Sequence, residues 1–148
     1  MAEFIANAIQ TVEANGNVLY TDTAVCPSKC ITRRAGSGIV RVKGLGNQRA
    51  RYLASFSGNI QIPTGGTVGE ISVAIAIDGE ILESTRMIVT PAAVENFFNV
   101  SAQVYVDIPC GCCLTLAVQN TSDQAIEVQN ANFIVVRTAK TGGTLCIS

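Results

Sequence analysis

The chain has 148 residues and a mass of 15.5 kDa, which fits one domain with a single core. Charged residues make up only 14% of it, against roughly 25% in an ordinary soluble domain, so uncharged polar residues or copies of the chain must cover much of its surface. The net charge of −1 excludes a global field that would recruit nucleic acid or a membrane.

Neither a membrane span nor a signal peptide is expected. No run approaches the roughly 18 apolar residues of a span, and residues 1–10 lack the basic region and long apolar core of a signal peptide. We therefore expect a protein that is made in a cytoplasm and not exported by the general route.

Hydrophobic and polar residues alternate through most of the chain, which is typical of strands with one buried face. The one helical candidate is a turn at residues 91–97, where Pro91 would open it. Roughly eight to ten short strands separated by turn residues predict an all-β antiparallel sandwich, and we favour a jelly roll. Strands are expected at 8–13, 17–21, 38–43, 51–62, 71–77, 80–89, 97–109, 113–119 and 125–137.

One hairpin has a specific turn signature. Asp78 and Gly79 suit the two left-handed positions of a type I′ turn, so residues 80–89 should return antiparallel to 71–77. The strand at 71–77 is apolar on both faces and therefore lies centrally or meets another subunit; the alternative is that its alanines lie beneath a loop. The candidate trimer interface consists of Ile71, Val73, Ala74, Ile75, Ala76 and Ile77.

The structural role of the first 35 residues is considered separately from the rest of the chain. They have strand character and are expected to act as an N-terminal arm or edge-strand segment, pairing with their own sheet or with a neighbour's. Residues 36–148 are expected to form the jelly-roll sandwich, so the whole chain is one globular domain.

Several segments resemble a known family. Residues 39–137, with IPTGGTVGEISVAIAIDGE, IVTPAA and NANFIVVRT, resemble the trimeric jelly rolls of the tumour necrosis factor (TNF) and complement C1q type. Over nearly its full length, GCC and AIEVQNAN included, the chain also resembles small virion-associated proteins of bacteriophages of gut Firmicutes. The resemblance transfers no functional residue to this chain.

The resemblance implies a function without catalysis. We expect a homotrimeric structural or decoration protein that docks on the capsid or a fibre of a phage, assembled in the host cytoplasm and carried in the virion. The alternative is a receptor- or carbohydrate-binding module on a bacterial or phage surface. Against the alternative, Trp is absent, and sugar sites usually stack their ligands on aromatic rings.

Six cysteines are the next candidates for chemistry. The absence of His excludes a nucleophile of the cysteine–histidine type, and we expect no enzyme activity, cofactor or metal. A four-thiolate zinc site is disfavoured because Cys112 and Cys113, adjacent on a strand, point to opposite faces. Cys26 and Cys30 are the candidate disulfide, with Cys110 or Cys146 as other partners, and Cys113 is expected to pack in the core.

Basic residues are concentrated in one segment. Residues 29–51 contain no Asp or Glu and seven of the ten basic residues: Lys29, Arg33, Arg34, Arg41, Lys43, Arg49 and Arg51. In a trimer they would recur three times and dock on an acidic partner, such as a capsid shell or an anionic cell-surface polymer. Nucleic acid is a weaker candidate because Tyr52 is the one aromatic nearby. The alternative is a solvated or intersubunit face.

Overall fold

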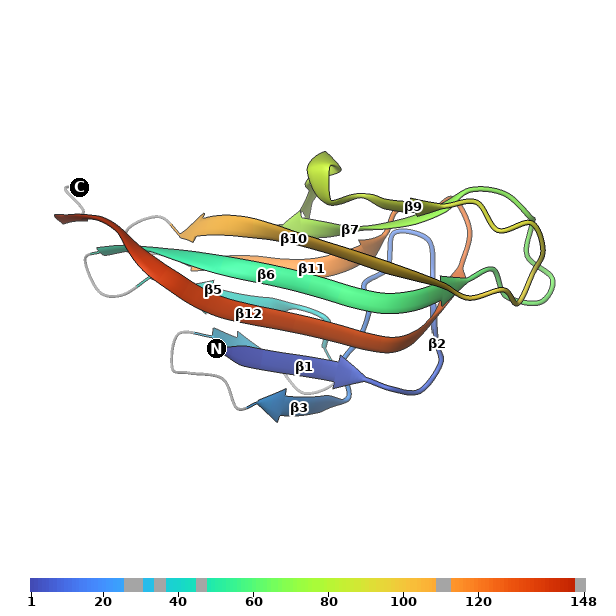
Figure 1. Cartoon of the computed structure of the whole chain (residues 1–148), viewed down its shortest axis with the longest axis horizontal. Coiled ribbons are helices and arrows are strands. Elements are labelled where there is room, and N and C mark those ends of the chain that lie inside the picture. Colours follow the sequence, from blue (N-terminus) through green and yellow to red (C-terminus); the bar gives the residue numbers. More distant parts are fainter. Residues whose placement is uncertain (26–30, 34–36, 45–47, 109–112, 146–148) are drawn as a thin grey trace.

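A computed structural model describes residues 1–25, 31–33, 37–44, 48–108 and 113–145. In it the chain forms two antiparallel sheets that face each other as a sandwich (Figure 1). The prediction of an all-β antiparallel sandwich is confirmed.

The sheet nearer the viewer in Figure 1, here called the front sheet, holds the longest strands. Its order is β10-β6-β12-β1-β3, with β2 also paired to β12. The N-terminal segment is therefore built into the chain's own front sheet, since β1 pairs with β12 and β3. The strands are β1 (Ala2–Ala6), β2 (Gln10–Val12), β3 (Asp22–Val25), β6 (Gln48–Gln61), β10 (Phe98–Ile108) and β12 (Ile126–Leu145).

The second sheet, here called the rear sheet, has the order β4-β5-β11-β7-β8, with β9 also paired to β7. A short 3-10 helix, η1 (Glu83–Thr85), interrupts the return from β8 to β9. The strands are β4 (Ile31–Arg33), β5 (Val40–Lys43), β7 (Ile71–Ile77), β8 (Glu80–Ile81), β9 (Met87–Val89) and β11 (Cys113–Asn120).

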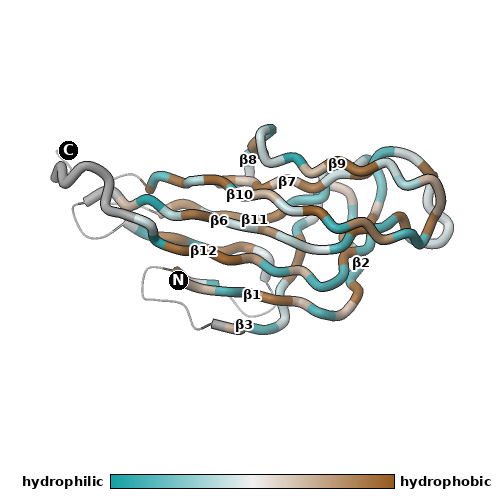
Figure 2. Tube along the Cα trace, viewed as in Figure 1, coloured by the Kyte–Doolittle hydropathy of each residue, from teal (hydrophilic) through white to brown (hydrophobic). Residues whose placement is uncertain are grey.

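The core lies between the two sheets and is built by the alternation seen in the sequence. Along β6, Tyr52, Ala54 and Phe56 are buried, while the residues between them are exposed or half-buried on the opposite face. Each long strand therefore contains both hydrophobic and hydrophilic residues along its length (Figure 2). The largest fully buried side chains are Tyr20, Tyr52, Phe4, Phe56, Phe133, Ile31, Ile60, Ile62, Ile71, Ile75, Ile108 and Leu116.

Two fully buried tyrosines differ in their polar contacts. The hydroxyl of Tyr52 donates to the carbonyl of Lys43 at 2.8 Å, linking the front sheet to the rear sheet. Tyr20 stacks on Phe133 at 5.9 Å, and no described residue hydrogen-bonds its hydroxyl. Burial raises the pKa of Tyr20 far above its usual range, and the nearby charge of Arg33 has a smaller effect in the opposite direction.

The Asp78-Gly79 turn is confirmed. Asp78 and Gly79 have φ angles of 51° and 82°, and Ile77 pairs with Glu80 across the turn. The Asp78 carboxylate also accepts hydrogen bonds from the backbone N–H of Thr115 at 2.8 Å and from its hydroxyl at 3.1 Å. The hairpin is thereby fixed to β11.

Three local predictions differ from the structure. Residues 91–97 form bends and turns instead of a helix, because Glu95 takes a left-handed conformation with φ of 62°. Residues 17–21 form no strand beyond a single bridge from Asn17 to Gln119. Segment 80–89, which was expected to return alongside β7 as one strand, is interrupted at η1. There the hydroxyl of Thr85 accepts a hydrogen bond from the backbone N–H of Ile75 at 2.9 Å. Within the described residues, no helix is long and apolar enough to span a bilayer.

Candidate functional site

The outward side of the front sheet carries three neighbouring rows of side chains across β10, β6 and β12. These nine residues are here called the front face. None of them is charged, but charged side chains border them. Glu3 on β1 pairs with Ile134 and accepts a hydrogen bond from Asn132 at 2.7 Å, and the Arg51 guanidinium lies 6.0 Å from the centre of the Tyr105 ring. The rows are Tyr105–Leu53–Val136, Gln103–Ser55–Ile134 and Ser101–Ser57–Asn132.

The front face combines a protruding aromatic ring with a hollow. Tyr105 is 62% exposed, and its row neighbours Leu53 and Val136 are half-buried. A hollow of about 280 Å³ begins at Gln103, which lies two residues before Tyr105 on β10. It exists because Ser55 and Ser57 are too small to fill the sheet surface between longer neighbours.

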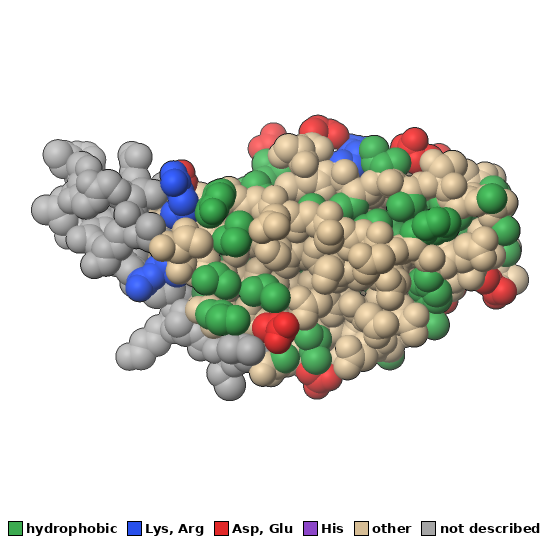
Figure 3. Space-filling view, viewed as in Figure 1, with side chains coloured by type: hydrophobic (Ala, Val, Ile, Leu, Met, Phe, Trp, Pro, Cys, Tyr) green, Lys and Arg blue, Asp and Glu red, His purple; other side chains and the backbone are tan. Residues whose placement is uncertain are grey.

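Figure 3 looks directly at this surface. Its middle is covered by apolar and uncharged polar groups, and Lys and Arg gather at one end of the molecule. This charge-poor surface has the composition of the central part of a protein interface, from which charged residues are depleted.

The end where the basic side chains gather is here called the basic end. On the front-sheet side Arg51 makes a two-pronged contact with Asp107, at 2.7 Å and 3.2 Å. The hydrogen bond and the charge of Asp107 raise the pKa of Arg51 above its ordinary value. Because both side chains are about half exposed, solvent screens the pair and its net contribution to stability is small.

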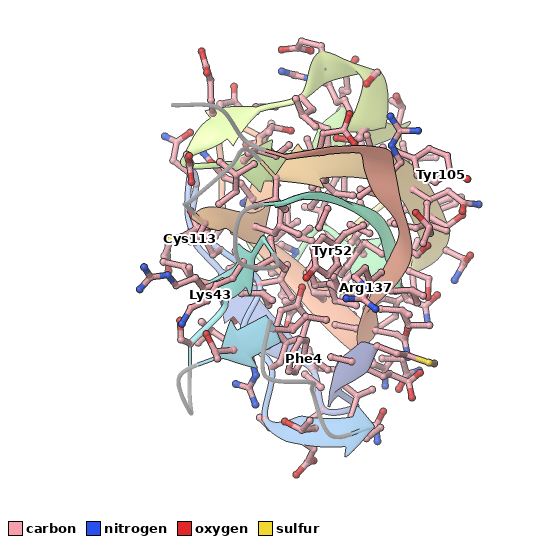
Figure 4. All side chains as sticks on the ribbon, turned by 90° about the vertical axis from the view of Figure 1, so that its left-hand side faces the viewer. Phe4, Lys43, Tyr52, Tyr105, Cys113 and Arg137 are labelled. Atoms are coloured by element: carbon pink, nitrogen blue, oxygen red, sulfur yellow. The ribbon has the colours of Figure 1, made fainter. Side chains whose placement is uncertain are left out.

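On the rear-sheet side the basic end holds Arg41, Lys43 and Cys113. The Arg41 guanidinium donates to the sulfur of Cys113 through Nε at 3.1 Å and Nη2 at 2.8 Å. Viewed from this end, Cys113 and Lys43 lie on one side of the sandwich and Tyr105 on the other, with Tyr52 between (Figure 4). The prediction that Cys113 packs in the core is wrong, because Cys113 is half-buried and lies on the face of β11 opposite the core residues Leu116 and Val118.

The four predicted docking residues whose side chains the structure describes do not form one continuous patch. Arg41 and Lys43 lie on β5, and Arg51 lies on the other sheet. Arg33 lies over the ring of Phe4 at 5.2 Å and donates to the carbonyl of Tyr20 at 2.9 Å, so it supports the core. The remaining predicted positions, Lys29, Arg34 and the side chain of Arg49, lie outside the described residues.

The predicted trimer interface on β7 is not supported by the burial of its residues. Ile71, Val73, Ala74, Ile75 and Ala76 are at most 1% exposed within a single chain, and Ile77 is half-buried. Side chains that are already covered have no surface to offer a second chain. Ile71, Val73 and Ile75 belong to the core between the sheets, whereas Ala74 and Ala76 lie on the opposite face of β7 and are covered there by the chain itself.

Sequence reasoning missed the front face as a surface. The signal was present in residues 98–108, where Tyr105 falls on the polar side of the strand. What the sequence did not show is that β6 and β12 place Leu53 and Val136 beside it.

The cysteine and metal predictions are only partly covered by the structure. Cys26, Cys30, Cys110, Cys112 and Cys146 lie outside the described residues, and with them the candidate disulfide. In the part of the chain that the structure describes, no group of three acidic or cysteine side chains is placed to hold a metal ion.

Comparison with solved structures identifies the fold. The globular domain of the zebrafish complement 1qA protein superposes with a TM-score of 0.61 at 11% identity, covering 90% of this chain and 94% of that one. The Eiger TNF of S. frugiperda gives a TM-score of 0.68 at 14% identity, over 99% and 97% of the two chains. Murine APRIL gives 0.52 at 13% identity, over 91% and 98%.

These similarities show that the sandwich is a jelly roll of the TNF and C1q type. No protein-family model matches the sequence, and no match is found among the curated proteins. At such low identity the likeness concerns the fold alone.

Proposed function

We propose that three copies of the chain assemble through the front face into a non-enzymatic structural module that decorates a bacteriophage particle. The front face is the observation that carries the proposal. It joins an exposed ring, Tyr105, to half-buried Leu53, Val136 and Ile134 on a surface without charge. Burying such a surface against another copy removes apolar area from water. The ions at its border keep their partners inside the chain, since Glu3 accepts a hydrogen bond from Asn132 at 2.7 Å and Arg51 pairs with Asp107.

The arrangement of the front face favours a closed ring of subunits. Tyr105 and the hollow lie on the same rigid sheet, so the ring of one chain cannot enter its own hollow. A contact between two different patches of identical chains is heterologous, and such contacts close into rings when the rotation permits. The resemblance to the TNF and C1q jelly rolls implies a ring of three, and the 14% charged content fits a chain covered by its own copies.

Docking on the particle is assigned to the basic end. Lys43 and Arg137 are exposed, and neither forms an ion pair with a described carboxylate. A trimer presents both residues three times, which attracts an acidic surface of a capsid or fibre. The resemblance to virion-associated phage proteins supports a phage particle as the site of docking, after assembly in the host cytoplasm.

The assembly is tested by light scattering on a size-exclusion column. We expect the wild type to have the mass of three 15.5 kDa chains and Leu53→Glu to be monomeric with an unchanged circular dichroism spectrum. Ile39→Glu is the matched control, since Ile39 is 46% exposed but lies beside β5 of the rear sheet, and it should remain trimeric. A wild type that is monomeric at micromolar concentration, or a Leu53→Glu trimer, refutes the interface.

Docking is tested by co-sedimentation with phage particles lacking the protein. The wild type should sediment with the particles at low ionic strength, where charges are little screened. A Lys43→Gln/Arg137→Gln double variant should bind at least about tenfold more weakly, because it removes two positive charges from each chain of the trimer. No sedimentation of a trimeric wild type would rule out the decoration role while leaving the trimer intact.

A further inference from the structure

A second hollow lies at the opposite end of the sandwich from the basic end, among the loops at the right of Figure 1. Residues 67–70, between β6 and β7, form one wall, and residues 121–124, between β11 and β12, form the other. Arg86, just before β9, also lines it. The volume of this loop groove is about 710 Å³, within the roughly 300–1,000 Å³ of small-ligand sites.

The two walls of the loop groove are fixed to each other. The side-chain amide of Gln124 donates to the carbonyl of Thr67 at 2.7 Å and accepts from its N–H at 2.9 Å. Fully buried Asn120 donates to the carbonyls of Val12 at 3.0 Å and Gln124 at 2.9 Å. A ligand would therefore enter a groove that is already formed, which lowers the entropy cost of binding.

The lining is rich in hydrogen-bonding groups. Ser72 and Thr121 share a hydrogen bond through their hydroxyls, and the hydroxyl of Ser122 accepts from the N–H of Ser72 at 2.8 Å. The carboxylates of Glu70 and Asp123 are on exposed residues, and no described side chain pairs with either. They are available as acceptors for a bound molecule.

Arg86 contributes a partly exposed guanidinium to the lining. Its Nη2 donates to Glu83 at 2.8 Å, and its side chain is 28% exposed. Its Nε is buried and has no hydrogen-bond partner among the described residues. A ligand oxygen would meet the accessible part of the guanidinium, where a charged N–H group is a strong hydrogen-bond donor.

We propose that the loop groove binds a neutral or amino-bearing saccharide. A polyol offers hydroxyl donors to Glu70 and Asp123 and hydroxyl oxygens to Arg86, which matches both kinds of group in the lining. An anionic ligand is disfavoured, because two carboxylates face it and the one guanidinium already pairs with Glu83.

The affinity for one sugar unit is low. Among the residues that the structure describes, no aromatic side chain lines the loop groove, and the one large apolar side chain there is that of Val68, which is 50% exposed. Without a ring for the sugar to stack on, a dissociation constant on the order of millimolar is expected. The loop groove shares no residue with the front face, so this site does not depend on the assembly proposed above.

The test is an NMR titration of the ¹⁵N-labelled full chain with methyl glucoside, galactose, glucosamine and N-acetylglucosamine, each up to about 50 mM. We expect at least one sugar to shift the amide signals of residues 67–70 and 121–124 in a saturable way. Glu70→Gln and Asp123→Asn should each weaken that binding about fivefold or more. Glu80→Gln, at the exposed hairpin on β8, is the matched control and should bind as the wild type does.

Three results would overturn the proposal. The first is no shift of these amides by any of the four sugars. The second is sugar binding that survives both Glu70→Gln and Asp123→Asn. The third is a response of the same amides to calcium chloride alone with no further change on adding sugar, which would make the loop groove a cation site.

Discussion

Exchanging each buried tyrosine for phenylalanine should change stability in opposite directions. Tyr20 and Tyr52 are both 0% exposed, but Tyr52 donates a hydrogen bond at 2.8 Å and the hydroxyl of Tyr20 has no described partner. Tyr52→Phe loses a hydrogen bond with a net value of about 1 kcal/mol, so it should lower the free energy of unfolding by about that amount. Burying a hydroxyl without a partner costs about 1–3 kcal/mol in proteins, and Tyr20→Phe removes such a hydroxyl. It should therefore raise the free energy of unfolding by about 1–2 kcal/mol.

The measurement is urea denaturation at pH 7, followed by circular dichroism, with all variants at one protein concentration because assembly is linked to folding. The transition midpoint should move up for Tyr20→Phe and down for Tyr52→Phe, with the slope of the transition unchanged. A Tyr20→Phe variant destabilised by about 1 kcal/mol or more would refute the reasoning, because it would mean that the Tyr20 hydroxyl has a partner.

The difference in the free energy of unfolding between the wild type and Tyr20→Phe should also depend on pH, and the sign of that dependence follows from the pKa shift. The pKa of Tyr20 is raised by burial, so the unfolded chain loses this proton first, near pH 10. Stability from the protonated hydroxyl is complete below about pH 10 and falls as the pH rises toward the folded-state pKa, by up to about 1.4 kcal/mol per pH unit. The advantage of Tyr20→Phe over the wild type should therefore widen between about pH 9 and about pH 11 in urea titrations; a constant difference would contradict it.

Three further substitutions test the packing and the polar contacts. Gly38→Ala should destabilise the chain by about 1–3 kcal/mol in thermal unfolding, because the new methyl group would overlap the backbone oxygen of Val18; an unchanged midpoint would show that the backbone there has more room. Asn120→Ala should cost at least about 3 kcal/mol, since its buried amide serves three carbonyls and one N–H, and a loss below about 1 kcal/mol in urea would contradict that role. Asp107→Asn breaks an exposed ion pair with Arg51 that solvent screens, so the urea midpoint should stay close to that of the wild type; a clear shift to lower urea would indicate that the pair is shielded from solvent.

Local sequence patterns determined the fold class. Alternation along residues 98–108 placed Val100 and Val106 in the core, and Asp78-Gly79 specified a tight hairpin by the φ angles those residues tolerate. Both signals act between neighbours in the chain, through the two-residue period of a strand and the sterics of single residues. Both signals can therefore be recognised in the sequence without knowing which strands pair with each other.

The candidate sites were decided by the tertiary structure. Alternation shows that Ala74 and Ala76 lie on one side of β7 but does not show that the rest of the chain covers that side. The basic segment looked continuous in sequence, but neighbouring strands of it enter opposite sheets and point Lys43 and Arg51 away from each other.

The two proposed surfaces have the same origin. The front face joins Leu53, Tyr105 and Val136, which come from three strands far apart in the chain, and the loop groove joins loops that follow β6 and β11 to Arg86. Such neighbours are set by long-range strand pairing and register, where a slip of one residue would turn every side chain to the other face. The sequence by itself therefore determined that the chain forms strands and a sandwich, and the pairing of those strands decided which side chains share a surface.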